Sequence, residues 1–340
     1  MEHYAGVDLH KRVTQLALLR EGRSPAHFRF RNEKAAVTKV LHRLPPGTKI
    51  AVESTGTWWW FVEQARQCGH DVYLSHPQRT KAIASARLKS DKVDAEMLGK
   101  LLQGDLLPTV WIPGERERYV RELLTHRQRL TRTRTAVINE LHAVYSKRNI
   151  ELQGAVWSKA QPTAVRVRAL TGYGPQIVQE NVAQLRLLNR QLAEIDKKLQ
   201  HLVLQDPQAK RLLSISGVGT QTALAVSCWV GDIARFPNAK KLASYFGLAP
   251  RVRNSAGKHQ HGHITKQGNP LVRWLLTQAA LSHIRHAKGD IRRQYLGALH
   301  RRGKSIARVA AARKLVGVMF HLLQDEIEYA EFVRRGNSTQ

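Results

Sequence analysis

The sequence predicts an α/β domain at the N-terminal end of the chain, then a long helical segment and a mainly helical C-terminal domain. Three observations support this prediction. Strand and helix patterns alternate over residues 4–107, two heptad-patterned helices follow, and the last third combines helical patterns with glycine-containing turns. We therefore expect domains at 1–112, 113–205 and 206–330, with a short tail over 331–340.

The order of the predicted elements indicates the kind of N-terminal sheet. Three apolar runs separated by short polar turns are typical of antiparallel strands: Tyr4–Leu9, Thr14–Arg20 and Ala26–Arg31. Further elements alternate between helix and strand: Glu33–Leu44, Lys49–Val52, a helix that ends at Gln67, Asp71–Ser75 and Lys81–Leu102. This is the order of an RNase H-like (RuvC-like) sheet, in which the first and fourth strands are neighbours.

Two long helices are predicted next, over Arg116–Lys147 and Gln176–Leu204. Apolar residues recur every seven positions in both: Leu123, Leu130, Val137 and Val144, then Val178, Leu185, Leu192 and Leu199. Such heptads are typical of a coiled coil, formed either as a hairpin within the chain or as a seam between protomers. Two helices packed separately on the rest of the fold are the alternative.

The C-terminal domain begins with the pattern of a helix-hairpin-helix. Gly217-Val218-Gly219 separates two helical runs, and its glycines allow backbone N–H groups at a helix N-terminus to approach a phosphate. A plain turn between two helices is the alternative. A loop over Gly247–Pro270, dense in Arg, Lys and His, and the helices Leu271–His286 and Ser305–Gln324 are expected to follow.

Net charge is the strongest compositional signal. The 340 residues include 55 Lys and Arg against 26 Asp and Glu, which gives a formal net charge of +29 and a pI near 10.8. Such a surface attracts polyanions, of which nucleic-acid phosphates are the commonest. Residues 206–340 carry 22 basic and 7 acidic residues, so this part is expected to hold most of the phosphate contacts.

Membrane and secreted classes are disfavoured by the same sequence. No apolar run is long enough to cross a bilayer, and no signal peptide precedes the first strand. The only cysteines, Cys68 and Cys228, exclude a disulfide scaffold and fit a reducing compartment. We expect a cytoplasmic protein, associated with the nucleoid when active.

Four acidic residues are candidates for one metal-binding site. Asp8 lies inside an apolar strand and Glu53 at the end of another, and Asp91 and Asp94 share one face of a helix. In an RNase H-like sheet these four carboxylates converge, and like charges need cations to stay ionised together. We expect two Mg²⁺ ions, with Mn²⁺ as a substitute, because hard oxygen ligands suit Mg²⁺ and paired ions activate phosphodiesters. Taken singly, each acid is compatible with a turn, a cap or a solvated helix face.

The segments around these acids resemble a known motif. Residues 4–11, 52–56 and 89–95 resemble the DEDD motif of insertion-sequence transposases with a RuvC-like N-terminal domain, relatives of the pilin-gene invertases. Residues 217–219, 246–250, 255–258 and 262–269 resemble, in that order, the C-terminal transposase domain of the same family. The resemblance covers nearly the whole chain.

This resemblance implies more than the residues show by themselves. It implies that the carboxylates act together with a serine nucleophile, here Ser255, through a phosphoserine intermediate. It also implies a structured guide RNA that pairs with donor and target DNA, and a homo-oligomer, either dimer or tetramer. Without the resemblance, Ser255 is compatible with an ordinary turn serine.

Several residues are predicted to contact nucleic acid: Gly217, Gly219, Arg251, Arg253, Lys258 and Lys266. Arginines of the first long helix either follow a nucleic-acid backbone or form a solvated face: Arg127, Arg129, Arg132 and Arg134. The alternating His259, His261 and His263 have no Cys or carboxylate nearby to complete a metal site, so a phosphate contact is favoured. Two other functions remain open, a hydrolytic RuvC-like nuclease of the junction-resolvase type and a nucleic-acid binder without catalysis.

Overall fold

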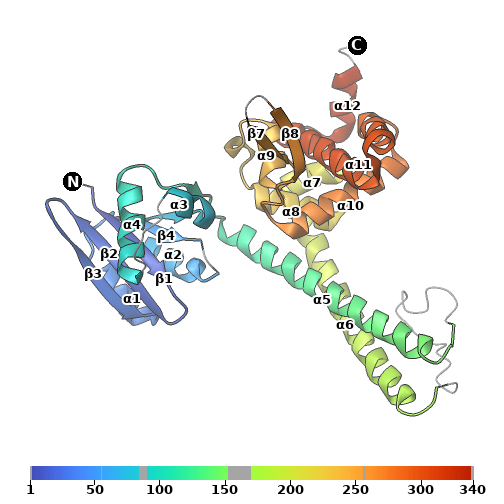
Figure 1. Cartoon of the computed structure of the whole chain (residues 1–340), viewed down its shortest axis with the longest axis horizontal. Helices are drawn as coiled ribbons and strands as arrows, with labels where there is room; N and C mark the ends of the chain where they lie inside the picture. Colours follow the sequence, from blue (N-terminus) through green and yellow to red (C-terminus); the bar gives the residue numbers. More distant parts are fainter. Residues whose placement is uncertain (1, 55, 84–89, 152–169, 256–257, 338–340) are drawn as a thin grey trace. The chain divides into compact units, whose positions relative to one another are not determined.

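The structure is a computed structural model of the chain, and it describes residues 2–54, 56–83, 90–151, 170–255 and 258–337, with backbone alone at 252–255, 258–261 and 337 (Figure 1). The chain divides into two compact units, Met1–Ile112 and Pro113–Gln340, which are described separately. In the described ranges no helix has the length and hydropathy needed to cross a membrane.

The first unit is built on a mixed six-stranded sheet with the strand order β3-β2-β1-β4-β5-β6. Its strands are β1 (Tyr4–Leu9), β2 (Val13–Arg20), β3 (Arg23–Arg31), β4 (Lys49–Glu53), β5 (Asp71–Ser75) and β6 (Thr109–Val110). Strand β1 runs antiparallel to β2 and parallel to β4. The first and fourth strands are therefore neighbours, as predicted, whereas the short strand β6 was not foreseen.

Helices cover both faces of this sheet (Figure 1). Helices α1 (Lys34–Leu41) and α2 (Trp58–Gln67) pack on one face, against apolar side chains such as Val7 and Leu16. Helix α4 (Asp91–Gln103) packs on the other face, and α3 (Pro77–Ile83) precedes it in the chain. The prediction of one helix over Lys81–Leu102 is wrong, because Ser90 is extended and caps α4 with its side chain.

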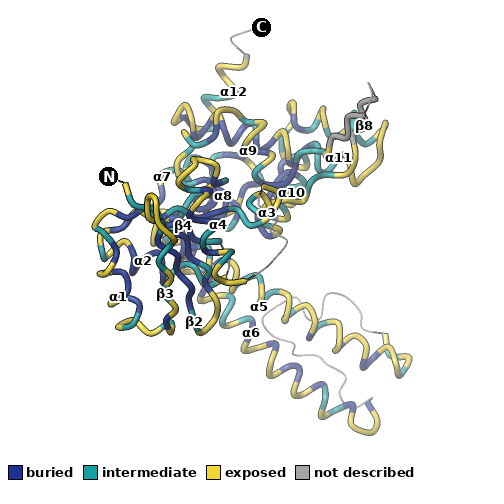
Figure 2. The backbone as a smooth tube through the Cα atoms, turned by 60° about the vertical axis from the view of Figure 1, so that its left-hand side comes forward, coloured by how far each residue is buried: buried dark blue, intermediate teal, exposed yellow. Residues whose placement is uncertain are grey.

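The second unit begins with two long helices, α5 (Glu115–Ser146) and α6 (Gly174–Leu204), that pack against each other. Leu130, Val137 and Leu185 of the predicted heptads are buried there. Buried and exposed positions alternate along both helices (Figure 2). Arg127 binds the Asp196 carboxylate with both Nε and Nη2, at 2.6 and 2.9 Å. Of the two predicted coiled-coil arrangements, the structure therefore has the hairpin within the chain.

The rest of the second unit is mainly helical. It contains α7 (Pro207–Leu213), α8 (Thr220–Val230), α9 (Ala239–Tyr245), α10 (Pro270–His286), α11 (Asp290–Gln324), α12 (Tyr329–Asn337) and a short 3-10 helix, η2 (Ile233–Arg235). Helix α11 is interrupted at Gly303, and α12 occupies most of the segment expected as a tail. Buried residues of α8, α10 and α11 join those of α5 and α6 in one apolar core.

The predicted loop over Gly247–Pro270 is instead a two-stranded antiparallel hairpin, formed by β7 (Pro250–Ser255) and β8 (Lys258–Ile264). The alternation of His259, His261 and His263, considered above as a metal pattern, is the period-two pattern of a strand. High charge concealed this signal, because the strands contain few of the apolar residues that usually mark a β-hairpin.

Candidate active site

Polar residues form a row across four adjacent strands of the first unit. Asp8 of β1 pairs with Gln15 of β2, and Glu53 of β4 pairs with Ser75 of β5. Because Val7 pairs with Val52, Asp8 and Glu53 lie at the same level on neighbouring parallel strands. Residues opposite each other in a sheet point to the same face, so the sheet presents these four side chains together. We call them the polar row.

The next row of residues allows α4 to lie close against the sheet. It contains Gly6 and Ala51, which pair with each other. A Cβ atom on Gly6 would lie 1.9 Å from the Ala95 carbonyl oxygen and 2.5 Å from the Gly99 backbone nitrogen of α4. Helix and strand therefore meet backbone to backbone, which a larger side chain at Gly6 would prevent. This contact fixes the start of α4 beside the polar row.

Helix α4 contributes two acids at its N-terminal end. Asp91 and Asp94 lie in the first turn, where the helix dipole favours negative charge. Asp91 is one turn before Ala95, the residue that contacts Gly6, and Asp94 is one turn before the buried Leu98. Both acids therefore lie at the end of α4 nearest the polar row.

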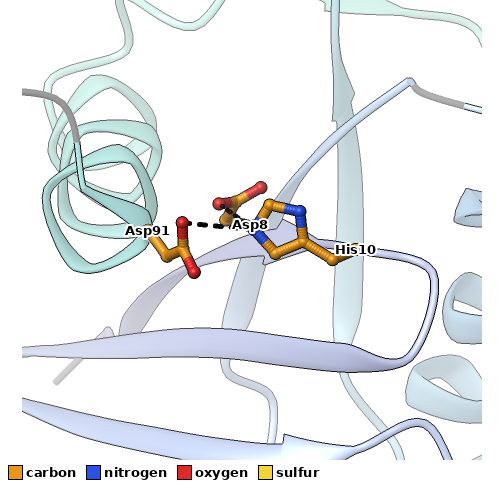
Figure 3. A group of neighbouring side chains, drawn as sticks. All are labelled: Asp8, His10 and Asp91. Carbon is orange, nitrogen blue, oxygen red and sulfur yellow. Dashed lines mark ion pairs between the residues drawn. The ribbon is translucent and has the colours of Figure 1, made fainter.

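His10 connects an acid of the sheet with an acid of the helix (Figure 3). Its Nε2 lies 3.1 Å from Asp8 Oδ2 and 3.3 Å from Asp91 Oδ1. The Asp8 side chain is 16% exposed, whereas those of His10 and Asp91 are about half exposed, at 52% and 55%. One donor atom from each of the three residues lies within 4.8 Å of the others, an arrangement able to hold a metal ion.

The four acids also interact electrostatically. Burial raises the pKa of Asp8, and the charges of Asp91 and Asp94 raise it further, while His10 lowers it. Burial likewise raises the pKa of Glu53, with further contributions from Asp8 and Asp94. Asp8, Glu53, Asp91 and Asp94 thus lie near enough for their charges to repel one another, and Asp8 and Asp91, with His10, are the ones whose ligand atoms lie within 4.8 Å of each other.

The donor set around these acids fits a divalent cation. Four carboxylates supply the hard oxygen ligands that Mg²⁺ prefers, and a cation relieves their repulsion. Two polar neighbours in the row are buried without hydrogen-bond partners in the described part of the chain: the Gln15 Nε2 and the Ser75 Oγ, in residues that are 3% and 0% exposed. Such groups are costly unless they find a partner, so the site is built for a polar occupant.

A cationic hollow adjoins the acids. It has a volume of about 510 Å³ and is lined by His10, Lys11, Arg12, Arg29 and Asp91. Arg29 pairs with Gln15, which extends the polar row to β3. Cations beside a carboxylate cluster suit an anionic substrate such as a phosphodiester.

His10 was not predicted from the sequence as a site residue. It lies in the turn that follows β1, two positions after Asp8, and the signal was its place within the segment 4–11. The interaction with Asp91 depends on the packing of α4, which residue spacing along the sequence does not reveal.

The predicted serine region is only partly described. The backbone pairs Ser255 with Lys258 at the end of the β7–β8 hairpin and Arg253 with Gln260. The side chains of Ser255, Arg253 and Lys258 lie outside the described residues. All of this hairpin belongs to the second unit, whereas the four acids belong to the first.

The other predicted phosphate contacts are described. Arg251 is exposed and donates to the Thr265 carbonyl oxygen at 3.5 Å. Lys266 is also exposed, at a positive φ of 54°, and its carbonyl oxygen accepts from Arg273. Neither side chain forms an ion pair with a described acid, and phosphate contact by both stays a prediction.

Gly217 and Gly219 have different structural roles. Gly217 has a φ of 88°, and a Cβ atom there would lie 2.5 Å from the His283 backbone nitrogen. Packing against α10 therefore requires glycine at Gly217. Gly219 precedes α8 in open space, beside a hollow that is also lined by Asp196, the ion-pair partner of Arg127.

Comparison with known families gives two matches. Residues 5–147 match the DEDD family profile of IS110 elements, described as "Transposase", and residues 209–296 match "Transposase IS116/IS110/IS902 family". The first match contains all four acids, and the second includes the turn between α7 and α8 and the β7–β8 hairpin.

Individual relatives extend over most of the chain. The "Probable family 20 transposase" of Pseudomonas aeruginosa is 28% identical over 332 residues, which cover 95% of this chain and 97% of that protein. The "Transposase for insertion sequence element IS1111A" of Coxiella burnetii is 29% identical, over 95% of this chain and 90% of its own. The "Pilin gene-inverting protein" of Moraxella bovis is 25% identical, over 84% and 81%.

Proposed function

The chain belongs to the IS110/IS116 family of transposases, and on this premise we propose that it cuts and rejoins DNA at the acidic end of its first unit. Its relatives are named as transposases and as a pilin gene-inverting protein, which are proteins of DNA transposition and inversion. The family match also suggests an RNase H-like fold for the sheet domain, which agrees with the strand order.

One observation carries the proposal: four acids from two strands and one helix are close enough to repel one another, beside a cationic hollow that Asp91 lines. The packing of Gly6 against Ala95 and Gly99 brings the acids close despite their repulsion. Like charges destabilise one another, so this cluster lowers the stability of the folded unit unless a bound cation compensates its charge. The arrangement is useful when divalent cations and a phosphodiester occupy it.

We assign Asp8, Glu53, Asp91 and Asp94 as the residues that hold Mg²⁺, two ions in all, with Mn²⁺ as a substitute. When bound, such ions polarise the phosphodiester and stabilise the charge that develops on its oxygens. The chain's own residues position the substrate: Lys11, Arg12 and Arg29 line the adjoining hollow and attract the phosphate backbone. His10 holds Asp8 and Asp91 in place through its Nε2.

We further propose that Ser255 is the nucleophile. Its hydroxyl loses a proton as the oxygen bonds to phosphorus, and the bond from phosphorus to one deoxyribose oxygen breaks. That oxygen takes up a proton and leaves as a free hydroxyl on the cut strand. The phosphoserine ester keeps the energy of the broken bond, so attack by a second DNA hydroxyl restores both Ser255 and a phosphodiester.

The remaining parts of the proposal concern partners. Donor and target DNA are the substrates, a guide RNA supplies base-pairing specificity, and the active form is a homo-oligomer, dimer or tetramer. We place the reaction in the cytoplasm, at the nucleoid. Charge supports the nucleic-acid partners, because residues 113–340 carry 38 basic against 15 acidic residues.

The direct test incubates the full chain with Mg²⁺, radiolabelled donor and target DNA and RNA transcribed from the flanking element. Products are separated on a denaturing gel before and after protease treatment. The wild type is expected to give joined DNA and a protease-sensitive protein–DNA adduct. Asp8→Asn is expected to give neither, and Ser255→Ala no adduct.

The same gel separates the competing functions. Free cut ends without an adduct, at equal rates in the wild type and Ser255→Ala, would show a hydrolytic nuclease that uses the acids alone. Unchanged joining by Asp8→Asn would contradict the whole assignment and leave a role in nucleic-acid binding. Omitting the RNA tests the guide separately, since the proposal expects joining to be lost without it.

A further inference from the structure

A groove with an exposed tryptophan lies in the second unit. Trp274 of α10 is 51% exposed, although tryptophan usually buries most of its large apolar surface. The groove beside it has a volume of about 410 Å³ and is lined by one stripe of α5, by Gln221 of α8 and by Pro270, Leu271 and Leu275 of α10. These elements belong to a single packed core.

The groove combines an aromatic surface with hydrogen-bonding groups. Gln128 and Gln221 each carry an amide that both donates and accepts, and Thr131 and Thr135 add hydroxyls. This is the chemistry that recognises the edge of a nucleobase once its face rests on an aromatic ring. The rest of the lining beside the ring is apolar, from Leu124, Leu271 and Leu275, and this surface suits the face of a base.

Charge in the groove is positive. Arg127 lines it but is bound to Asp196 through two contacts, at 2.6 and 2.9 Å, so this pair is close to neutral. Arg132, one turn further along the same stripe, is exposed and forms no ion pair with a described acid. One cation is therefore left to attract a phosphate beside the tryptophan.

We propose that this groove binds one unpaired nucleotide of a nucleic-acid strand, with its base stacked on Trp274 and its phosphate near Arg132. A base within a duplex has both faces stacked on its neighbours, so only an unpaired base offers a face to the ring. The inference rests on a nucleic-acid partner but not on the cleavage chemistry, because no acid of the first unit takes part in it.

The test measures binding of the full chain to fluorescein-labelled 12-nucleotide strands of mixed sequence, one of RNA and one of DNA, and to a DNA hairpin duplex. Trp274→Leu keeps an apolar side chain but removes the aromatic ring, and Trp274→Phe keeps a ring. We expect Trp274→Leu to weaken single-strand binding about 5- to 100-fold, with Trp274→Phe near the wild type and duplex binding unchanged. Comparison of the two strands shows whether RNA or DNA is the preferred source.

Arg132→Gln provides an independent variant. It is expected to reduce the slope of log affinity against log salt by about 0.7 for the single strands, as for loss of one phosphate contact. Tyr173→Leu is the matched control, because Tyr173 is an aromatic residue that is 80% exposed and lies outside the groove. Its single-strand affinity is expected to equal that of the wild type.

Three results would overturn the inference. The first is wild-type single-strand binding by Trp274→Leu in a folded protein, checked by circular dichroism. The second is an equal loss in Tyr173→Leu, which would show a general aromatic effect. The third is a change of sedimentation coefficient in Trp274→Leu without a change in nucleic-acid affinity, which would show that the groove joins two copies of the chain. DNA cleavage is measured in a separate assay, so a chain that binds single strands through Trp274 but does not cut DNA would support this inference and contradict only the proposed cleavage.

Discussion

Two aspartates, Asp8 in the first unit and Asp206 in the second, are both largely buried, yet their surroundings differ. The Asp206 carboxylate is 3% exposed and fully satisfied. It accepts from the Arg116 Nη2 at 3.0 Å, from the Ser227 Oγ at 2.6 Å and from the Ala209 backbone N–H at 3.0 Å. Asp8 instead faces three other acids, with His10 as its ion-pair partner among the described residues.

This difference separates a structural acid from a functional one. The partners of Asp206 belong to the protein, so its charge is compensated before any ligand binds. The charge at Asp8 is compensated only in part, and the buried Gln15 beside it also lacks a partner in the described ranges. An incompletely satisfied polar group in an otherwise well-packed domain indicates a ligand site more strongly than an acidic residue type does.

The largest expected effect is on catalysis. Asp8→Asn keeps the shape of the side chain but removes the charge that holds a metal ion, so DNA joining should fall by about 10³-fold or more. Joining is measured on the denaturing gel described above. Asp206→Asn is the matched control, and once correctly folded it should retain activity within about tenfold, because Asp206 caps a helix and lies outside the polar row.

The second prediction concerns the contact that assembles the acids. Gly6→Ala places a methyl group against backbone atoms of α4, so the first unit should lose about 3 kcal/mol of stability or more. Gly99→Ala should cost less, because its nearest neighbour, the Gly6 backbone nitrogen, would lie at 3.1 Å. Urea unfolding measures both variants, and equal stability of Gly6→Ala and the wild type would refute the backbone contact.

The third prediction concerns loss of the Asp206 carboxylate, whose partners all belong to the protein. Asp206→Ala leaves Arg116 without its carboxylate and removes the cap of α7, so unfolding of the second unit should cost about 2–3 kcal/mol less. The value is reduced from that of a fully buried pair because Arg116 is 43% exposed. Calorimetry should show this loss in the second unit while metal binding stays unchanged.

The smallest effect concerns pH. Burial and neighbouring acids raise the pKa of Glu53, so the folded state favours its neutral form. Without metal, stability of the first unit should therefore fall as pH rises from the ordinary carboxyl pKa through the raised one. In chelator at pH 8, Glu53→Gln should raise the melting temperature of the first unit by about 2–4 °C. No rise, or a decrease, would mean that Glu53 is stabilised in its charged form.

Much of the first unit could be predicted from the sequence, because short apolar runs mark its strands and their order along the chain is typical of one kind of sheet. The apolar runs placed β1, β2 and β4, and strand order then placed Asp8 beside Glu53. The bridge formed by His10 could not be predicted in this way, since it depends on how closely α4 approaches β1. Gly6 sets that distance, and the sequence shows Gly6 only as a member of a motif, without its contact to α4.

The second unit was less predictable for a different reason. Heptads indicated two paired helices, but both an internal hairpin and a seam between protomers satisfy the same pattern. Charged strands concealed the β7–β8 hairpin, because backbone pairing leaves no signal when the side chains are Arg, Lys and His. The exposure of Trp274 could not be predicted either, since a tryptophan in a helical run is expected to face the core.

Metal binding tests the central claim most directly. Titration of the full chain with Mn²⁺, followed by the loss of the free-ion electron paramagnetic resonance signal, requires neither DNA nor RNA. The account predicts saturable binding to the wild type, strong weakening in Asp8→Asn and unchanged binding in Asp206→Asn. Equal Mn²⁺ affinity in the wild type and Asp8→Asn would contradict it.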